Sequence, residues 1–93
     1  MSSQLLASRL MVRNAATMLD EEHPNRSTAA AMAKQFATEA CTKICNDALQ
    51  LHGGYGYLKD YPIERQLRDV RVHEILEGTS EVMKMITSRH LLA

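Results

Sequence analysis

The stretch from residue 27 to residue 51 constrains the fold most, because nothing in it interrupts a helix. It contains no glycine or proline, and its apolar residues recur at helical spacing for about seven turns. Most of these residues are small, so a neighbouring helix can approach closely. Ser27 or Thr28 is the expected N-cap, and Gly53 is the expected terminator. The sequence therefore predicts one helix of about 40 Å against which the rest of the chain can pack.

Three shorter helices are predicted around it. Residues 4–21 have a helical pattern that ends at His23-Pro24, because proline disfavours helical angles in the residue before it. The apolar stripe expected to face the core contains Leu6, Leu10, Val12, Ala16 and Leu19. Pro62 opens a third helix, and a fourth runs from about Ser80 to Leu91. No segment alternates like a strand, so the predicted fold class is all-α, an antiparallel helical bundle segment of about four helices.

Length and charge exclude several classes of function. The 93 residues are enough for one domain, taken as residues 1–93. Eleven basic residues balance eleven acidic ones, which argues against binding to nucleic acid or to an anionic membrane surface. No apolar run reaches the ~20 residues that a membrane span needs. The chain is therefore expected to bind neither nucleic acid nor a membrane.

The third predicted helix carries alternating charges. Its basic residues recur at helical spacing, and acidic residues stand among them: Arg65, Arg68 and Arg71 with Glu64, Asp69 and Glu74. A solvated face of ion pairs is the preferred interpretation. Contact with an anionic ligand is the alternative.

Cys41 and Cys45 lie four positions apart on one helical face. No second cysteine or histidine pair stands at zinc spacing. Buried free thiols in a reducing compartment are therefore expected, and neither a disulfide nor a metal site is.

Residues 52–61, HGGYGYLKDY, form the one glycine-rich segment and hold three of the four glycines. The segment is not a Walker loop, because no Gly-Lys-Ser/Thr follows. It is not a dinucleotide fingerprint, because it follows a predicted helix and not a strand. A segment of this kind exposes backbone N–H groups and can pack closely against a partner or a cofactor.

Residues 73–81, HEILEGTSE, break the helical pattern a second time. Glu77 directly precedes Gly78, and Thr79 and Ser80 offer hydroxyls that can cap a new helix. Glycine also lets a ligand approach the backbone closely. Glu77 is therefore a candidate catalytic carboxylate held at a helix junction. An exposed glutamate at a structural corner is the alternative.

These two segments, in this order and at this separation, resemble the C-terminal helical domain of the acyl-CoA dehydrogenases. The resemblance covers essentially the whole chain and rests on LHGGYGYLKDY at residues 51–61 and RVHEILEG at residues 71–78. It implies an FAD-dependent oxidoreductase with an N-terminal helical domain and a middle β-domain besides this one. The two segments resemble most the members that oxidise short branched acyl-CoA substrates, with isobutyryl-CoA of valine catabolism first among them.

The resemblance implies roles by position. Glu77 matches the catalytic base, which removes the α-proton of an acyl-CoA thioester while FAD takes the β-hydride and a 2-enoyl-CoA forms. Gly78 and Arg89 match substrate-binding positions. Thr79 and Glu81 match positions beside the flavin, although several members have glutamine where Glu81 stands. The segment that reaches the FAD of a neighbouring subunit is matched by Gln50, His52, Gly53 and Gly54.

The resemblance also implies partners and a compartment. Electron-transfer flavoprotein is the implied electron acceptor, and a homotetramer is the implied assembly. The implied compartment is the mitochondrial matrix for a eukaryotic source and the cytoplasm for a bacterial one. The alternative hypothesis is a catalytically silent helical assembly module, because the 93 residues encode one rim of the site. In that form the chain is expected to hold no FAD, to lack dehydrogenase activity and to associate through its apolar faces.

Overall fold

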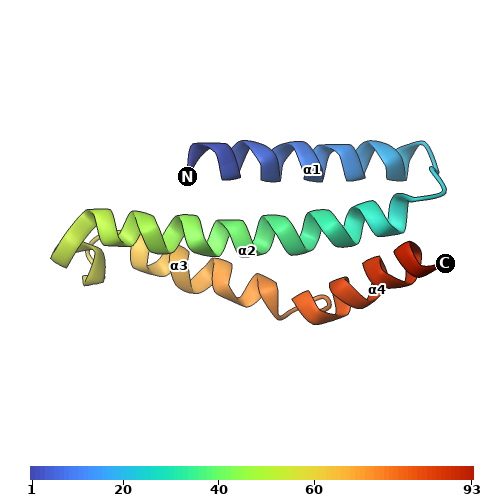
Figure 1. Ribbon diagram of the computed structural model, residues 1–93. Coiled ribbons are helices and arrows are strands. Elements are labelled where there is room, and N and C mark those ends of the chain that lie inside the picture. The colour runs from blue at the N-terminus through green and yellow to red at the C-terminus, as the bar shows by residue number, and fades with distance from the viewer.

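The computed structural model describes residues 1–93 as an all-helical chain, and it confirms the predicted fold class (Figure 1). Four α-helices and two short 3-10 helices follow one another. They are α1 (Ser2–Asp20), α2 (Arg26–His52), η1 (Gly53–Tyr57), α3 (Ile63–Arg71), η2 (Val72–Glu74) and α4 (Ser80–Leu92). None of the helices is both long and apolar enough to span a membrane.

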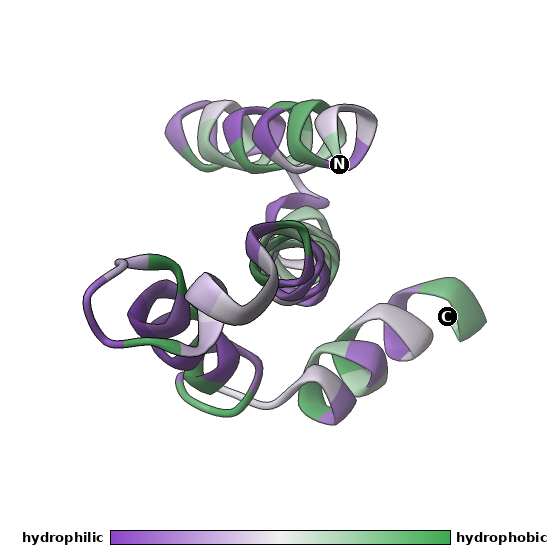
Figure 2. Ribbon diagram, turned by 90° about the vertical axis from the view of Figure 1, so that its left-hand side faces the viewer, coloured by the Kyte–Doolittle hydropathy of each residue, from purple (hydrophilic) through white to green (hydrophobic).

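Helix α2 is the centre of the molecule, because each of the other helices packs on it. Helix α1 runs antiparallel to it on one side, and α3 and α4 follow one another along the other side (Figure 1). Viewed end-on in Figure 2, α3 and α4 diverge beneath α2. The chain measures 49 × 22 × 18 Å with a radius of gyration of 15.4 Å. A compact chain of this length would have a radius of about 13 Å, so the bundle segment is elongated.

The turn between α1 and α2 explains why α2 begins earlier than predicted. Asn25 is the N-cap, so the expectation of Ser27 or Thr28 was wrong. The Arg26 guanidinium donates to the carbonyls of Glu22 and His23, both at 3.0 Å. These bonds hold the turn against the first residue of the helix, which lets helical geometry begin there.

The other end of α2 agrees with the prediction. Gly53 ends the helix with a φ of +63°, a left-handed angle at which glycine has no Cβ to clash. The glycine-rich segment that follows begins with the 3-10 helix η1, which covers Gly53–Tyr57.

The predicted inward stripe of α1 was wrong. Leu6, Leu10, Val12 and Leu19 are between 48% and 58% exposed, and Ala16 is exposed as well. The buried residues of this helix are Ser8 and Ala15. At about 100° per residue the predicted positions are spread around α1, with Leu10 on one flank, Val12 and Leu19 on the other, and Leu6 on the outer side. The face between the flanks packs on α2, and it carries Ser8 and Ala15 together with the half-buried Gln4, Ala7, Met11 and Met18.

The buried core is thin and consists mainly of small side chains. Nine of the 93 residues are buried, so most large apolar side chains keep an exposed surface. The apolar core members are Ala15, Ala31, Ala33, Ala40, Ile63 and Met83. Close packing of helices therefore depends on alanines of α2 that leave room for their neighbours.

The two cysteines are free, as expected, but they are half-buried and not buried. No group of three metal-ligating side chains occurs in the chain. Burial raises the pKa of the Cys45 thiol, and the neighbouring Cys41 raises it further. This thiol is consequently a weaker nucleophile near neutral pH than an exposed one.

Gly56 allows a close approach between η1 and α2. A Cβ placed on Gly56 would lie 2.6 Å from the carbonyl oxygen of Leu49, whereas a Cβ on Gly54 would meet nothing within 4 Å. Gly56→Ala is expected to lower the free energy of unfolding by about 1–3 kcal/mol, because backbone must move to admit the methyl group. Gly54→Ala is the matched control and should change it by less than about 0.5 kcal/mol. Urea titrations followed by circular dichroism measure both, and equal losses would contradict this account.

Candidate active site

The backbone between η2 and α4 turns through two consecutive left-handed residues. Glu77 has a φ of +56°, and Gly78 has a φ of +92°. Glycine adopts such angles readily, but for glutamate the left-handed region costs roughly 1–2 kcal/mol. A strained side-chain-bearing residue persists only where its surroundings hold it, and such residues gather at functional sites. We call residues 76–79 the Glu77 corner.

Thr79 closes the Glu77 corner on the α4 side. Its hydroxyl accepts a hydrogen bond from the Val82 N–H at 3.2 Å, which confirms that one of the two predicted hydroxyls caps this helix. Ser80, the other candidate, does not act as a cap. Its Oγ is buried and has no hydrogen-bond partner.

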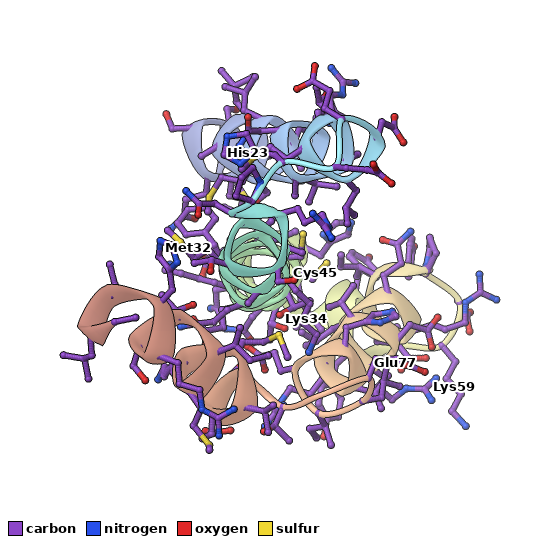
Figure 3. All side chains as sticks on the ribbon, turned by 90° about the vertical axis from the view of Figure 1, so that its right-hand side faces the viewer. His23, Met32, Lys34, Cys45, Lys59 and Glu77 are labelled. Carbon is purple, nitrogen blue, oxygen red and sulfur yellow. The ribbon has the colours of Figure 1, made fainter.

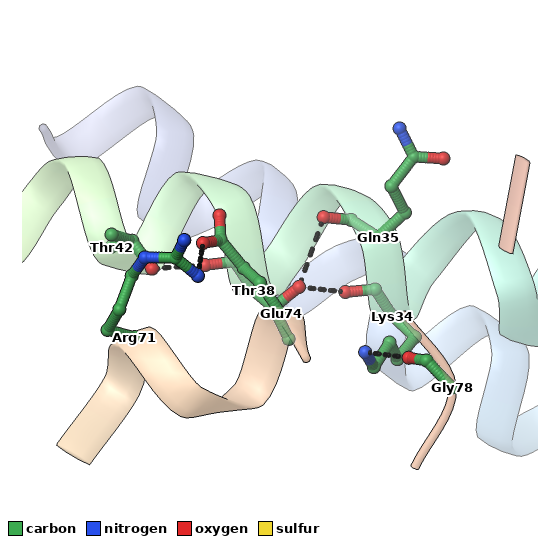
Figure 4. A network of polar contacts seen from close by, with 7 residues as sticks. All are labelled: Lys34, Gln35, Thr38, Thr42, Arg71, Glu74 and Gly78. Atoms are coloured by element: carbon green, nitrogen blue, oxygen red, sulfur yellow. Dashed lines mark hydrogen bonds and ion pairs between the residues drawn. The ribbon is translucent and has the colours of Figure 1, made fainter. Parts of the chain in front are cut away.

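Lys34 reaches the Glu77 corner from α2. Its Nζ donates to the carbonyl oxygen of Gly78 at 2.5 Å, across 44 positions of sequence (Figure 4). Figure 3 shows Lys34 beneath α2 and Glu77 farther out, with its carboxylate away from that helix. Sequence reasoning missed this contact. The available signal was a lysine within the alanine-rich part of the long helix.

A small polar cleft of about 200 Å³ lies beside the corner, between α2 and the first turn of α4. It is lined by Glu39, Arg71, Glu74, Ile75, Thr79, Ser80 and Glu81. Arg71 and Glu74 form an ion pair across 2.9 Å, which Figure 4 shows next to α2. The Glu77 side chain lies outside this lining, is exposed and has no hydrogen-bond or ion-pair partner.

The first turn of α4 offers donors that suit a flavin nucleotide. The backbone N–H groups of Ser80 and Glu81 bond to no other backbone group, as is usual at a helix start. The buried Ser80 hydroxyl lacks a partner too. Oxygen and nitrogen acceptors of a bound cofactor can satisfy such groups, and the positive end of the helix dipole favours negative charge there. The first turn of α4 therefore has donors that could hold the acceptor atoms of a bound cofactor such as FAD.

The predicted site residues divide into two groups and one outlier. Glu77, Gly78, Thr79 and Glu81 lie together at the corner and the start of α4. Arg89 is exposed in the last turn of α4, roughly 14 Å along the helix from Ser80. Gln50, His52, Gly53 and Gly54 are exposed at the far end of α2 and in η1. A single chain does not bring this second group to the Glu77 corner.

The charged face of α3 is largely the solvated one that the sequence predicted. Arg68 pairs with Glu64 at 2.9 Å, and Arg71 pairs with Glu74. The hydrogen bond from Arg68 lowers the pKa of the Glu64 carboxyl, and the charge of Arg68 lowers it further. Arg65 forms no ion pair.

The sequence model that describes the protein family "Acyl-CoA dehydrogenase, C-terminal domain" matches residues 1–92 of this chain. This chain belongs to the acyl-CoA dehydrogenase family. It is 59% identical over 92 residues to the mitochondrial isobutyryl-CoA dehydrogenase of Bos taurus, covering 99% of this chain and 22% of the relative. It is 54% identical over 93 residues to a 3-(aryl)acrylate reductase of Clostridium sporogenes, covering 99% of this chain and 24% of the relative.

Solved structures of the family show the same arrangement of helices. The butyryl-CoA dehydrogenase of Megasphaera elsdenii superposes with a TM-score of 0.95 at 38% identity, over 99% of this chain and 24% of that one. The chain thus spans less than a quarter of the relatives that it matches.

The capping role of Thr79 predicts a stability change. Thr79→Ala removes the acceptor for the Val82 N–H and should lower the free energy of unfolding by about 1 kcal/mol. Thr79→Ser keeps the hydroxyl, so this variant should retain most of the wild-type free energy of unfolding. Chemical denaturation followed by circular dichroism compares the two variants. A serine variant as unstable as the alanine variant would point to the threonine methyl group instead of the cap.

Proposed function

We propose that this chain is the C-terminal part, residues 1–93, of an FAD-dependent acyl-CoA dehydrogenase that oxidises a short branched acyl-CoA, isobutyryl-CoA, to the 2-enoyl-CoA. The observation that carries the proposal is Glu77, a free carboxylate on a strained corner of a chain from this family. The choice of substrate is supported by 59% identity to isobutyryl-CoA dehydrogenases from both Bos taurus and Dictyostelium discoideum.

In this proposal Glu77 is the base for the α-proton of the thioester. A carboxylate is a suitable base for a carbon acid next to a carbonyl if it is within hydrogen-bond reach of the proton and water is excluded. The exposed Glu77 has no partner to compete for its oxygens. FAD, when bound, supplies the acceptor for the β-hydride. The backbone at Gly78 lets the substrate approach closely, and Arg89 contributes positive charge toward the substrate.

Cofactor contacts in this proposal come from two places. Thr79, Ser80 and Glu81 hold the cofactor beside Glu77 through the start of α4, where the free donors lie. Residues 50–54 serve the FAD site of a neighbouring subunit, because they lie at the far end of α2 from the corner. A site built from two neighbouring chains requires a homo-oligomer, and we propose a tetramer.

Electron-transfer flavoprotein is the proposed electron acceptor. Relatives of this chain include a subunit named for a caffeyl-CoA reductase–Etf complex, at 49% identity. A solved structure that is named for the electron transferring flavoprotein of Acidaminococcus fermentans superposes on this chain with a TM-score of 0.93 at 44% identity. The proposed location is the mitochondrial matrix for a eukaryotic source, in line with two relatives named as mitochondrial, and the cytoplasm for a bacterial source.

The test of Glu77 uses the full-length enzyme. Glu77→Gln keeps the size of the side chain but removes the base, so isobutyryl-CoA oxidation with an artificial electron acceptor should fall by roughly 10²–10⁴-fold. The flavin absorption spectrum should be unchanged. Asp69→Asn, an exposed acidic residue without an ion pair, is the matched control and should keep full activity. An active Glu77→Gln enzyme with FAD bound would place the base elsewhere.

The second candidate is a catalytically silent assembly module in the 93-residue form. Its support is the thin core and the exposed leucines on the flanks of α1. A chain with these surfaces is expected to associate through them, whatever its catalytic competence in a longer protein.

The purified 93-residue chain is therefore expected to be colourless and associated. Light scattering over a concentration series should give a mass above the monomer that rises with concentration. Leu10→Glu on a flank of α1 should shift it toward the monomer, because burying an unpaired charge is unfavourable. Arg9→Glu, on the exposed polar face of α1, is the control and should leave the measured mass unchanged. A yellow chain with a flavin spectrum, or a monomer at every concentration, would contradict this expectation.

A further inference from the structure

The corner that carries Glu77 has almost no hydrogen bonds of its own. Neither Glu77 nor Gly78 donates its N–H to another backbone group. The nearest backbone bond before them runs from the Leu76 N–H to the Val72 carbonyl at 3.0 Å. The nearest bonds after them run from the Met83 N–H to the Thr79 carbonyl at 3.0 Å and from the Val82 N–H to the Thr79 hydroxyl. Between these bonds the left-handed backbone of Glu77 and Gly78 has no backbone hydrogen bond to hold it.

The bond from Lys34 supplies the missing constraint. It is the one hydrogen bond that the structure gives to either Glu77 or Gly78. The donor is an ammonium group, so the bond is charge-assisted and stronger than a bond between neutral groups. It fixes the Gly78 carbonyl toward α2 (Figure 4), and this orientation leaves the Glu77 side chain on the opposite, outer side (Figure 3).

Lys34 has no competing partner and no substitute. It is half-buried and forms no ion pair with any carboxylate. The next residue along the same face of α2, Thr38, donates its hydroxyl to the carbonyls of Lys34 and Gln35 and so offers no donor to the corner. A half-buried ammonium group with a single carbonyl partner is costly unless that bond is kept.

We propose that Lys34 is a positioning residue, which sets the direction of the Glu77 carboxylate by anchoring the Gly78 carbonyl to α2. The inference rests on the proposed role of Glu77 as the base. Lys34 acts on the backbone behind the base and does not touch the reacting atoms. Because a displacement of about 1 Å at a reacting group can cost 10²-fold in rate, losing this anchor should slow proton abstraction far more than it weakens substrate binding.

The experiment compares Lys34→Met, which keeps the aliphatic stem but removes the donor, with Lys34→Arg, which keeps a cationic donor. In the full-length enzyme Lys34→Met should lower kcat for isobutyryl-CoA about 100-fold, with KM and FAD content within about threefold of the wild type. Lys34→Arg should recover most of kcat. The deuterium isotope effect on kcat with α-deuterated substrate should rise in Lys34→Met, because proton abstraction becomes slower. A lysine with a purely structural role would not lower kcat and raise the isotope effect while leaving KM and FAD content nearly unchanged.

Two further variants separate the possible outcomes. Lys43→Met removes an exposed lysine from the same helix and should leave kcat unchanged. In a Glu77→Gln background, Lys34→Met should not lower kcat further, because the effects of two substitutions that act through one group are not additive. If Lys34→Met does not fold, Lys34→Gln takes its place, since the shorter amide does not reach as far.

The outcomes distinguish this inference from the proposed function. An inactive Glu77→Gln enzyme together with wild-type kcat in Lys34→Met overturns the positioning role alone. Full activity in Glu77→Gln overturns the assignment of the base, whatever Lys34→Met does. A loss in Lys34→Met that Lys34→Arg does not reverse, or an equal further loss in the Glu77→Gln background, also overturns the positioning role.

Discussion

Close packing against the alanines of α2 is the constraint on which the rest of the structure depends. Ala31, Ala33 and Ala40 are buried, and they let helices approach α2 from both sides. Helix α1 occupies one side, while α3 and α4 share the other (Figure 1). Because the other helices rest on α2 far more than on each other, the position of the Glu77 corner is defined relative to this single helix.

The corner shows how a stable scaffold carries a strained element. Glu77 and Gly78 both adopt left-handed angles, which a short connection tolerates only when its two ends are held. Leu76 is bonded back to η2, Thr79 caps α4, and Lys34 ties the middle to α2. With these left-handed angles the Glu77 carboxylate is exposed at the surface, while the backbone behind it stays attached to the bundle.

The distribution of apolar and polar groups indicates surfaces that suit further contacts. The leucines on the flanks of α1 are exposed, and the unpaired donors at the start of α4 lie beside the corner. Residues 50–54 lie at the opposite end of α2 from Glu77. Under the proposed function these features are complementary, because each chain would supply a base to its own site and a glycine-rich rim to a neighbouring one.

The sequence by itself determined the helices, their order and the corner, because these depend on local chemistry. Residues 27–51 lack glycine and proline, Gly53 ends a helix, and a hydroxyl follows Gly78 as a cap. Only the tertiary structure decided which face of α1 turns inward. The smaller Ser8 and Ala15 are buried, because small side chains let two helices approach closely, while Leu6, Leu10, Val12 and Leu19 stay exposed. The tertiary structure also decided that Lys34 meets Gly78, since a contact across 44 positions depends on how two helices pack and leaves no periodic signal in the sequence.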